Sequence, residues 1–362
     1  MRIAVIGGGN GAYAAAADLA EQGHEVRLWR RDGAALEPLA KRGAITLTDF
    51  RGSREVALAL VTPEIGEAGA GAELVLAPLP APAQEALAEA LAPHLSAGQV
   101  VFLPPGTFGS FVMARRLREL GNRAPLAFAE AGTLPYLARK HGPAEIAITT
   151  RATRLPSGVF PAAEGDAAFA VIEAAYPALE RLTDALDGAL MNAGPIIHPP
   201  LILMNAGPIQ HFEHWDIHNE DTQPAIRSVT DALDEERIAV REALGYGAPH
   251  FPLADHYHEG GDEWMYGNAV HERIVDSGDW RESLDLHSHR YMREDVAMGV
   301  AFLVSVAEWA GVPCPVARGL LALASALLGE DLRAGPRTLE GLGLAASAPA
   351  ELKAMLQRGF EQ

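Results

Sequence analysis

Near its N-terminus the chain reads Ile3-Ala4-Val5-Ile6-Gly7-Gly8-Gly9-Asn10-Gly11-Ala12, and this stretch decides the fold of the first half. An apolar run of strand length leads into glycines spaced G-x-G-x-x-A, and a helical pattern follows. In this arrangement the first glycine permits a tight turn, the second admits a pyrophosphate, and the helix N-terminus faces the phosphates. The alternative is a glycine turn that binds no ligand. We predict a dinucleotide site with these cofactor-binding residues: Gly7, Gly9, Asn10, Gly11 and Ala12.

Outward from this stretch, strands alternate with helices. Strands are predicted at Ile3–Ile6, Glu25–Trp29, Leu74–Ala77 and Val100–Leu103, and helices at 12–22, 36–42 and 83–95. Such alternation is typical of a parallel sheet with crossover helices. No strand is predicted after Thr150.

The second half has a different pattern, with long helices predicted at Ser228–Leu244, Glu294–Ala310 and Val316–Leu328. The sequence therefore predicts an α/β protein in two domains. A Rossmann-type parallel-sheet domain occupies residues 1–184, and an all-α substrate and catalytic domain occupies residues 185–362.

Composition excludes several classes of function. Lys and Arg number 29 against 47 Asp and Glu, a net charge of −18, which disfavours nucleic acid and anionic membranes as partners. A single cysteine, Cys314, allows neither an internal disulfide nor a site of several thiolates. The N-terminus has no signal-peptide pattern, and no apolar run is long enough to span a membrane. We expect a cytoplasmic protein without a bound metal.

The residues after the second strand bear on the choice of cofactor. An acidic residue about 20 positions beyond the glycines suits the ribose of NAD, whereas arginine suits the 2′-phosphate of NADP. Here Arg30 and Arg31 come first and Asp32 follows, which favours NADP(H). The alternative is that both arginines are solvated and Asp32 binds the ribose. Pro80, after the strand at 74–77, is assigned to the cofactor site as well.

Two titratable residues in the second half are candidates for proton transfer. His198 stands in an uncharged stretch, so we expect it to be partly buried, with Pro199 and Pro200 in the first turn of a helix. From Asp295, steps of three and four residues meet only apolar positions, so its carboxylate is expected to face the core. A buried aspartate is the usual partner that orients a histidine. A satisfied core histidine and a helix-terminal aspartate are the alternatives.

The chain resembles the opine dehydrogenase family along nearly its whole length. The most specific stretches are GGGNGA at the start, NAGPIIHPPLILMNAG, LDEERIAVREALG, and LDLHSHRYMREDVAMGVAFLVSVAEWAGVPCP. The resemblance implies that His198 is the catalytic histidine, Asp295 its partner and Arg290 a substrate-binding arginine. We assign the asparagines of the repeated NAGPI, Asn192 and Asn205, to substrate binding.

The resemblance implies a reductive condensation in which an amine or amino acid joins a 2-oxo acid and NAD(P)H reduces the imine. Two other functions stay open: a 2-oxo acid reductase that needs no amine, similar to ketopantoate reductase, and an NADPH-binding sensor without turnover. The His- and aromatic-rich segment His211–His218 departs from the family pattern and is expected to line the substrate mouth rather than bind metal. A homodimer is a further expectation.

Overall fold

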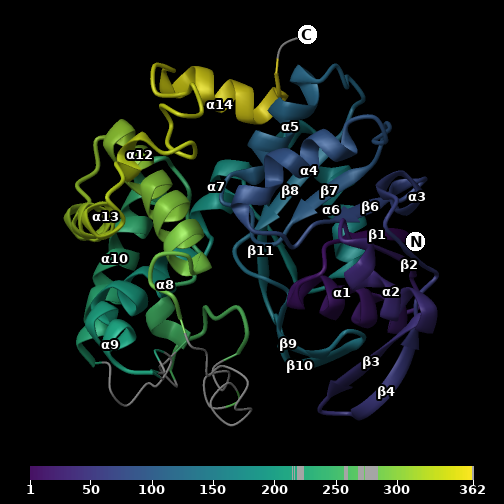
Figure 1. Ribbon diagram of the computed structural model, residues 1–362. Helices are drawn as coiled ribbons and strands as arrows, with labels where there is room; N and C mark the ends of the chain where they lie inside the picture. The colour runs from purple at the N-terminus through teal and green to yellow at the C-terminus, as the bar shows by residue number, and fades with distance from the viewer. Residues whose placement is uncertain are drawn as a thin grey trace. The chain divides into compact units, whose positions relative to one another are not determined.

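A computed structural model describes the chain at residues 1–213, 215, 217, 224–256, 260–267, 273 and 284–360. The chain forms two units (Figure 1). One unit consists of Met1–Ala189 together with the residues from Ala354 onward, and the other is Leu190–Lys353. The domain boundary after residue 184 stays a prediction of the sequence.

The first unit is built on an eight-stranded sheet with the order β12-β11-β8-β7-β6-β1-β2-β5. Its strands are β1 (Arg2–Ile6), β2 (Glu25–Trp29), β5 (Leu60–Thr62), β6 (Leu74–Leu76), β7 (Val100–Leu103), β8 (Ala127–Ala131), β11 (Leu155–Phe160) and β12 (Leu179–Arg181). All neighbours pair in parallel except β8 and β11. The predicted parallel-rich sheet is confirmed.

The expectation that no strand follows Thr150 is wrong, because β11 and β12 extend the sheet. β11 was not predicted because it contains Pro156 and Gly158, two residue types that are unfavourable inside a strand. Gly158 is required by packing: a Cβ atom there would collide with the carbonyl oxygen of Asp184. The backbone of this strand therefore approaches a neighbouring segment that no local pattern reveals.

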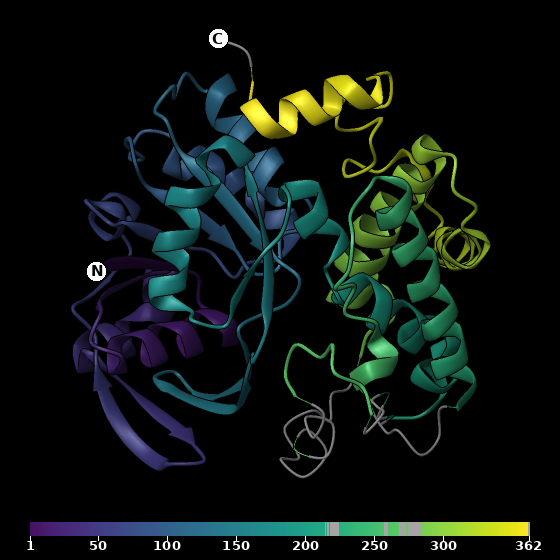
Figure 2. The same ribbon diagram turned by 180° about the vertical axis from the view of Figure 1, so that it is seen from behind.

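Helices cover both faces of the sheet (Figures 1 and 2). They are α1 (Asn10–Glu21), α2 (Gly33–Arg42), α3 (Ile65–Gly69), α4 (Gln84–Leu91), α5 (Gly109–Glu119), α6 (Gly165–Ala175) and α7 (Ala185–Leu190), with short 3₁₀ turns at Ala81–Ala83 and Ala162–Glu164. Alternate strand residues such as Ile3 and Val5 join the buried cluster formed with α1 and α6. Helix α2 ends at Arg42, as predicted, and Gly43 after it is in the left-handed conformation (φ 68°).

A second, four-stranded sheet with the order β4-β3-β10-β9 was not predicted. Its strands are β3 (Ala44–Asp49), β4 (Gly52–Ala57), β9 (Tyr136–Gly142) and β10 (Glu145–Arg151). The signal was present in β3, where buried Ile45 and Leu47 alternate with more exposed threonines.

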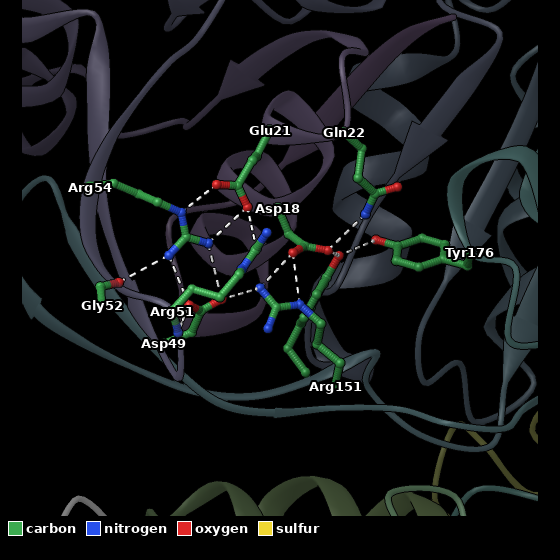
Figure 3. Close-up of polar contacts among 10 residues, drawn as sticks. Asp18, Glu21, Gln22, Asp49, Arg51, Gly52, Arg54, Arg151 and Tyr176 are labelled. Carbon is green, nitrogen blue, oxygen red and sulfur yellow. Dashed lines mark hydrogen bonds and ion pairs between the residues drawn. The ribbon is translucent and has the colours of Figure 1, made fainter.

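Polar contacts between α1 and the second sheet are drawn in Figure 3. Arg151 of β10 donates to Asp18 of α1 (Nε to Oδ1, 2.8 Å) and to Asp49 at the end of β3 (Nη2 to Oδ2, 2.7 Å). Arg54 of β4 joins Asp49 (Nη1 to Oδ1, 2.8 Å) to Glu21 of α1. We call these five residues the α1 ion network. The side chains of Asp18 and Asp49 are largely buried, so their ion pairs are shielded from water. The network therefore holds the four-stranded sheet against α1.

Strand β9 runs from this network toward the first turn of α1. At its start, the Tyr136 hydroxyl donates to Asp18 Oδ2 (3.0 Å). Further along, the backbone N–H of Lys140 donates to Asn10 Oδ1 (3.0 Å). The strand is therefore held at both ends against the helix that follows the glycine turn.

Among its described residues the second unit has helices and connecting loops but no strand, which confirms the all-α prediction. Its helices are α8 (Gly194–Met204), α9 (Ala206–His211), α10 (Pro224–Ala243), a π-helix (Tyr291–Val300), α12 (Ala301–Ala310) and α13 (Pro315–Leu328), with 3₁₀ turns at Leu253–His256 and Leu332–Ala334. Helix α14 (Pro349–Arg358) leads the chain into the first unit. In the part of the chain that the structure describes, no helix has the length and apolar character to cross a bilayer.

Two helix predictions need correction. The predicted helix Glu294–Ala310 starts three residues earlier and begins as a π-helix, a geometry that apolar spacing alone does not reveal. Pro199 and Pro200 lie inside α8 rather than in its first turn, which Pro195 occupies. Each proline removes one helical hydrogen bond. Both proline rings are buried, and their packing offsets this loss.

Candidate functional site

The glycine turn lies between β1 and α1, as the sequence predicts. Gly7 has a φ of 134°, a conformation that L side chains rarely adopt, and its N–H donates to the Trp29 carbonyl (2.8 Å). A Cβ on Gly11 would lie 3.0 Å from Leu134 and 3.2 Å from Pro78. Nothing lies within 4 Å of where a Cβ on Gly9 would be, so its backbone is open to a ligand.

The two arginines after β2 differ in their surroundings. Arg30 packs over the turn, because a Cβ on Gly8 would lie 2.6 Å from its Cδ and Nε atoms. Arg31 is exposed. Asp32 caps α2 by accepting from the Ala35 N–H (3.0 Å), and its other oxygen lies 3.9 Å from Arg30 Nη2. The carboxylate that would bind a ribose is therefore engaged in a helix cap.

Lys140 is a cation at this turn that the sequence did not single out. Its Nζ atom donates to the Gly8 carbonyl (3.1 Å) and lies 3.4 Å from the centroid of the Tyr13 ring. Burial and the neighbouring Arg30 lower the pKa of Lys140 to about 8. Two cations, Lys140 and Arg30, thus lie against the same glycine of the turn, Gly8.

The residues that follow β6 contact the glycine turn through Pro78 and Leu79, which were not predicted, rather than through Pro80. Pro80, assigned to the cofactor site, is exposed at the start of a 3₁₀ turn. Its neighbours are closer to the glycines: Pro78 packs on Gly11, and a Cβ on Gly7 would lie 3.0 Å from Leu79.

In the helical unit, His198 of α8 and Asp295 of the π-helix form a hydrogen-bonded pair. Their Nδ1 and Oδ2 atoms are 2.8 Å apart, with 17% of the histidine side chain and 9% of the aspartate side chain exposed. Burial raises the pKa of Asp295, and the nearby Arg290 and His289 side chains oppose the rise. The partial burial of His198 and the inward-facing carboxylate are as the sequence predicts.

Tyr291 completes this pair and was missed from the sequence. Its ring is fully buried and stacks on the His198 imidazole, with 3.7 Å between centroids and 9° between planes. His289 meets the same ring edge-on at 4.4 Å. The Arg290 guanidinium carbon lies 5.2 Å from the ring centroid, and Arg290 itself is exposed.

Two glycines let α8 and the π-helix approach closely enough for this contact. A Cβ on Gly299 would overlap the Pro195 ring, and a Cβ on Gly194 would lie 2.5 Å from Asp295 Oδ1. Any side chain at either position would push the two helices apart. The His198–Asp295 distance therefore depends on both glycines.

The two asparagines predicted to bind substrate are buried and form hydrogen bonds with other groups of the protein. Asn192 Oδ1 accepts from the Gly194 N–H (3.0 Å) at the start of α8. Asn205 donates to the Leu201 carbonyl (2.8 Å) and accepts from Trp215 Nε1 (2.7 Å). Of the segment 211–218, His214, Asp216 and His218 lie outside the described residues.

Family models match both halves of the chain. The model described as NAD/NADP octopine/nopaline dehydrogenase, alpha-helical domain, matches residues 181–328, and the model Ketopantoate reductase PanE/ApbA matches residues 3–149. The chain is 27% identical over 360 residues to an opine dehydrogenase of Arthrobacter sp. (strain 1C), covering 98% of each chain.

Solved structures share the fold. Octopine dehydrogenase in complex with NADH and agmatine matches with a TM-score of 0.66 at 18% identity, over 96% of this chain and 98% of that one. Yersinopine dehydrogenase with NADP⁺ bound matches with a TM-score of 0.67 at 14% identity, over 99% and 98%.

The fold, the glycine turn and these relatives define the chain as an NAD(P)-dependent oxidoreductase. Within that class the chain is similar to the opine dehydrogenase family along nearly its whole length, as the sequence motifs indicated.

Proposed function

We propose that the protein catalyses the NADPH-dependent reductive condensation of a 2-oxo acid with an amine or amino acid, and the reverse oxidation. The observation that carries this proposal is the His198–Asp295 pair, stacked on Tyr291 within the octopine/nopaline dehydrogenase domain. The amine attacks the carbonyl carbon, water leaves, and an imine forms. When bound, NADPH supplies the hydride to the imine carbon, and one proton on the imine nitrogen completes the secondary amine.

His198 is the proposed general acid and base. Its Nδ1 atom is held by Asp295, so Nε2 is the nitrogen that exchanges a proton with the substrate. Asp295 sets the ring orientation and stabilises the imidazolium that forms when a proton is taken from the amine. The protonated ring returns that proton to the departing hydroxyl group as water leaves.

Arg290 is proposed to bind the substrate carboxylate, because the residue is exposed and its guanidinium stands beside the Tyr291 ring that supports the histidine. Asn192 and Asn205 are proposed to shape the substrate site through the groups they hold. Asn192 fixes the first turn of α8, and Asn205 anchors Trp215.

NADPH is the proposed cofactor, with Gly7, Gly9, Asn10, Gly11 and Ala12 around the pyrophosphate. The support is the position of Arg30 over the glycine turn and the use of Asp32 as a helix cap. Arg31 adds positive charge at the same end of β2. A cytoplasmic location and a homodimer stay predictions from the sequence.

A second function is favoured by one observation, the match of the first 149 residues to the ketopantoate reductase model. On that alternative the same histidine protonates the carbonyl oxygen while hydride reaches the carbonyl carbon. The product is a 2-hydroxy acid, and no amine is needed.

The deciding experiment follows NADPH and NADH oxidation across a panel of 2-oxo acids, each with and without amines, and identifies products by mass spectrometry. We expect amine-dependent NADPH oxidation that yields an N-(carboxyalkyl) product. Turnover without amine to a hydroxy acid would establish the second function. Cofactor binding with no turnover on any pair would favour a sensor.

Two variants make this test specific. His198→Ala should abolish turnover while the affinity for NADPH stays the same, because the histidine lies in the other unit from the glycine turn. His94→Ala, at an exposed histidine, is the matched control and should keep full activity. Loss of turnover in both variants would point to a general defect rather than to a catalytic role.

A further inference from the structure

We infer that Lys140 and Arg30 together form the binding site for the 2′-phosphate of NADP(H), with β9 of the second sheet supplying the lysine. The inference rests on the proposed use of NADPH and adds a residue that the strand–turn–helix motif does not contain. It assigns a cofactor contact to a part of the fold outside the main sheet.

The first argument is the position of the ammonium. Lys140 Nζ lies 3.1 Å from the Gly8 carbonyl oxygen, and Arg30 packs over the same glycine. Since Arg30 directly follows β2, where the adenosine ribose of a bound dinucleotide lies, the phosphate nearest to both cations is the one on that ribose.

The second argument is charge. Among the described residues, no carboxylate forms an ion pair with Lys140, and the only ion pair of Arg30 is the 3.9 Å contact with Asp32. Two half-buried cations side by side repel one another, and this repulsion adds to burial, the larger cause, in lowering the pKa of the lysine. A phosphate dianion bound between them would remove this repulsion.

The third argument is that the lysine is held in place before a ligand arrives. The Tyr13 ring supports the ammonium at 3.4 Å, and the Lys140 backbone N–H is bonded to Asn10. Lysine is also scarce in this chain. Of its three lysines, Lys41 and Lys353 are exposed, and only Lys140 is half-buried.

The test measures dissociation constants for NADPH and NADH by direct titration of the full chain. Lys140→Met should weaken NADPH binding about 10- to 100-fold, the range for one charge-assisted hydrogen bond, and change NADH binding less than about threefold. Lys140→Arg should restore most of the NADPH affinity. Lys41→Met removes a charge from an exposed lysine and should change neither affinity.

A second measurement avoids substitution altogether. The three lysines are acylated with a limiting amount of an amine-reactive ester, and the modified peptides are counted by mass spectrometry. NADPH should protect Lys140 at least about fivefold, NADH should protect it clearly less, and Lys41 and Lys353 serve as internal controls.

The outcomes separate the inference from the proposed function. Unchanged NADPH affinity in Lys140→Met, in a protein that binds and oxidises NADPH, overturns the inference alone. Equal losses for NADPH and NADH would place the lysine on the pyrophosphate and also overturn it. A wild-type protein that binds neither cofactor would instead contradict the proposed function.

Discussion

The imidazole of His198 lies face to face with the phenol ring of Tyr291, at 3.7 Å between centroids. The Tyr291 ring covers one face of the imidazole and stabilises its protonated form through a cation–π interaction of about 0.5–2 kcal/mol. Asp295 binds the edge of the imidazole at Nδ1. The orientation and charge of His198 are therefore controlled by two residues on neighbouring turns of one helix.

We expect Tyr291→Leu to move the acidic limb of the kcat/KM pH profile to lower pH by about 0.5–1 unit, because the protonated imidazole loses its aromatic support. Tyr291→Phe keeps the ring and should leave the profile in place. A drop in kcat without any movement of the profile in Tyr291→Leu would indicate a purely structural role.

Asp295→Asn preserves the shape of the partner and removes its charge. We expect kcat to fall about 100- to 10,000-fold, because the uncharged amide neither stabilises the imidazolium nor enforces the tautomer. NADPH affinity, measured by titration, should be unchanged. A variant that retains more than a tenth of wild-type kcat would show that Asp295 is not the partner on which His198 depends.

Gly299→Ala tests the close approach of α8 and the π-helix. The added methyl group overlaps Pro195, so we expect a loss of about 1–3 kcal/mol of stability together with a lower kcat. Gly319→Ala in α13 is the matched control, since nothing lies within 4 Å of its Cβ, and it should stabilise by about 0.5–1 kcal/mol. Thermal unfolding and initial rates measure both; equal Tm values for the two variants would contradict the packing argument.

NADPH affinity should depend on pH through Lys140. Its pKa of about 8 means that the free protein loses this charge above pH 8, whereas a bound phosphate favours the ammonium. Of the groups that face it, Arg30 stays charged and Tyr13 stays neutral, because burial raises the pKa of the phenol. We therefore expect the NADPH dissociation constant to rise about tenfold between pH 7 and pH 9.5.

Lys140→Arg supplies the control for that pH dependence. Arginine stays protonated over the whole range, so the NADPH dissociation constant of the variant should be flat. NADH binding should be flat in both proteins. A wild-type curve with no slope above pH 8 would contradict the assignment of this titration to the lysine.

The α1 ion network should make the first unit sensitive to acid. Arg54 and Arg151 hold the pKa of Asp49 well below its usual range, so the carboxylate contributes stability above the unfolded-state pKa of about 3.9 and loses it as the pH falls further. Asp49→Asn should cost about 1–3 kcal/mol at pH 7 and show a weaker acid dependence below pH 4. Glu37→Gln, which breaks the exposed pair with Lys41, should cost less than about 0.5 kcal/mol, and Tm values at pH 3 and pH 7 compare the two.

Local sequence patterns predicted those features of the fold and the site that are determined by residues close together in the chain. The glycine turn, the helices on either side of it and the inward-facing Asp295 all follow from periodicity and short motifs. Lys140 could not be found in this way, because it reaches the turn only through a second sheet that was not predicted. Tyr291 adjoins a recognised motif, but its stack on His198 depends on a π-helix and on two glycines that set the helix spacing.

The α1 ion network has a consequence for how the preference for one nicotinamide cofactor changes during evolution. None of its five residues belongs to the glycine turn, yet they fasten the strand that brings Lys140 to Gly8. Substitutions at Arg151 or Asp18 would therefore shift the preference between NADPH and NADH without touching either molecule. Selection for a new cofactor has two separate places to act, and only one of them lies in the motif by which such proteins are recognised.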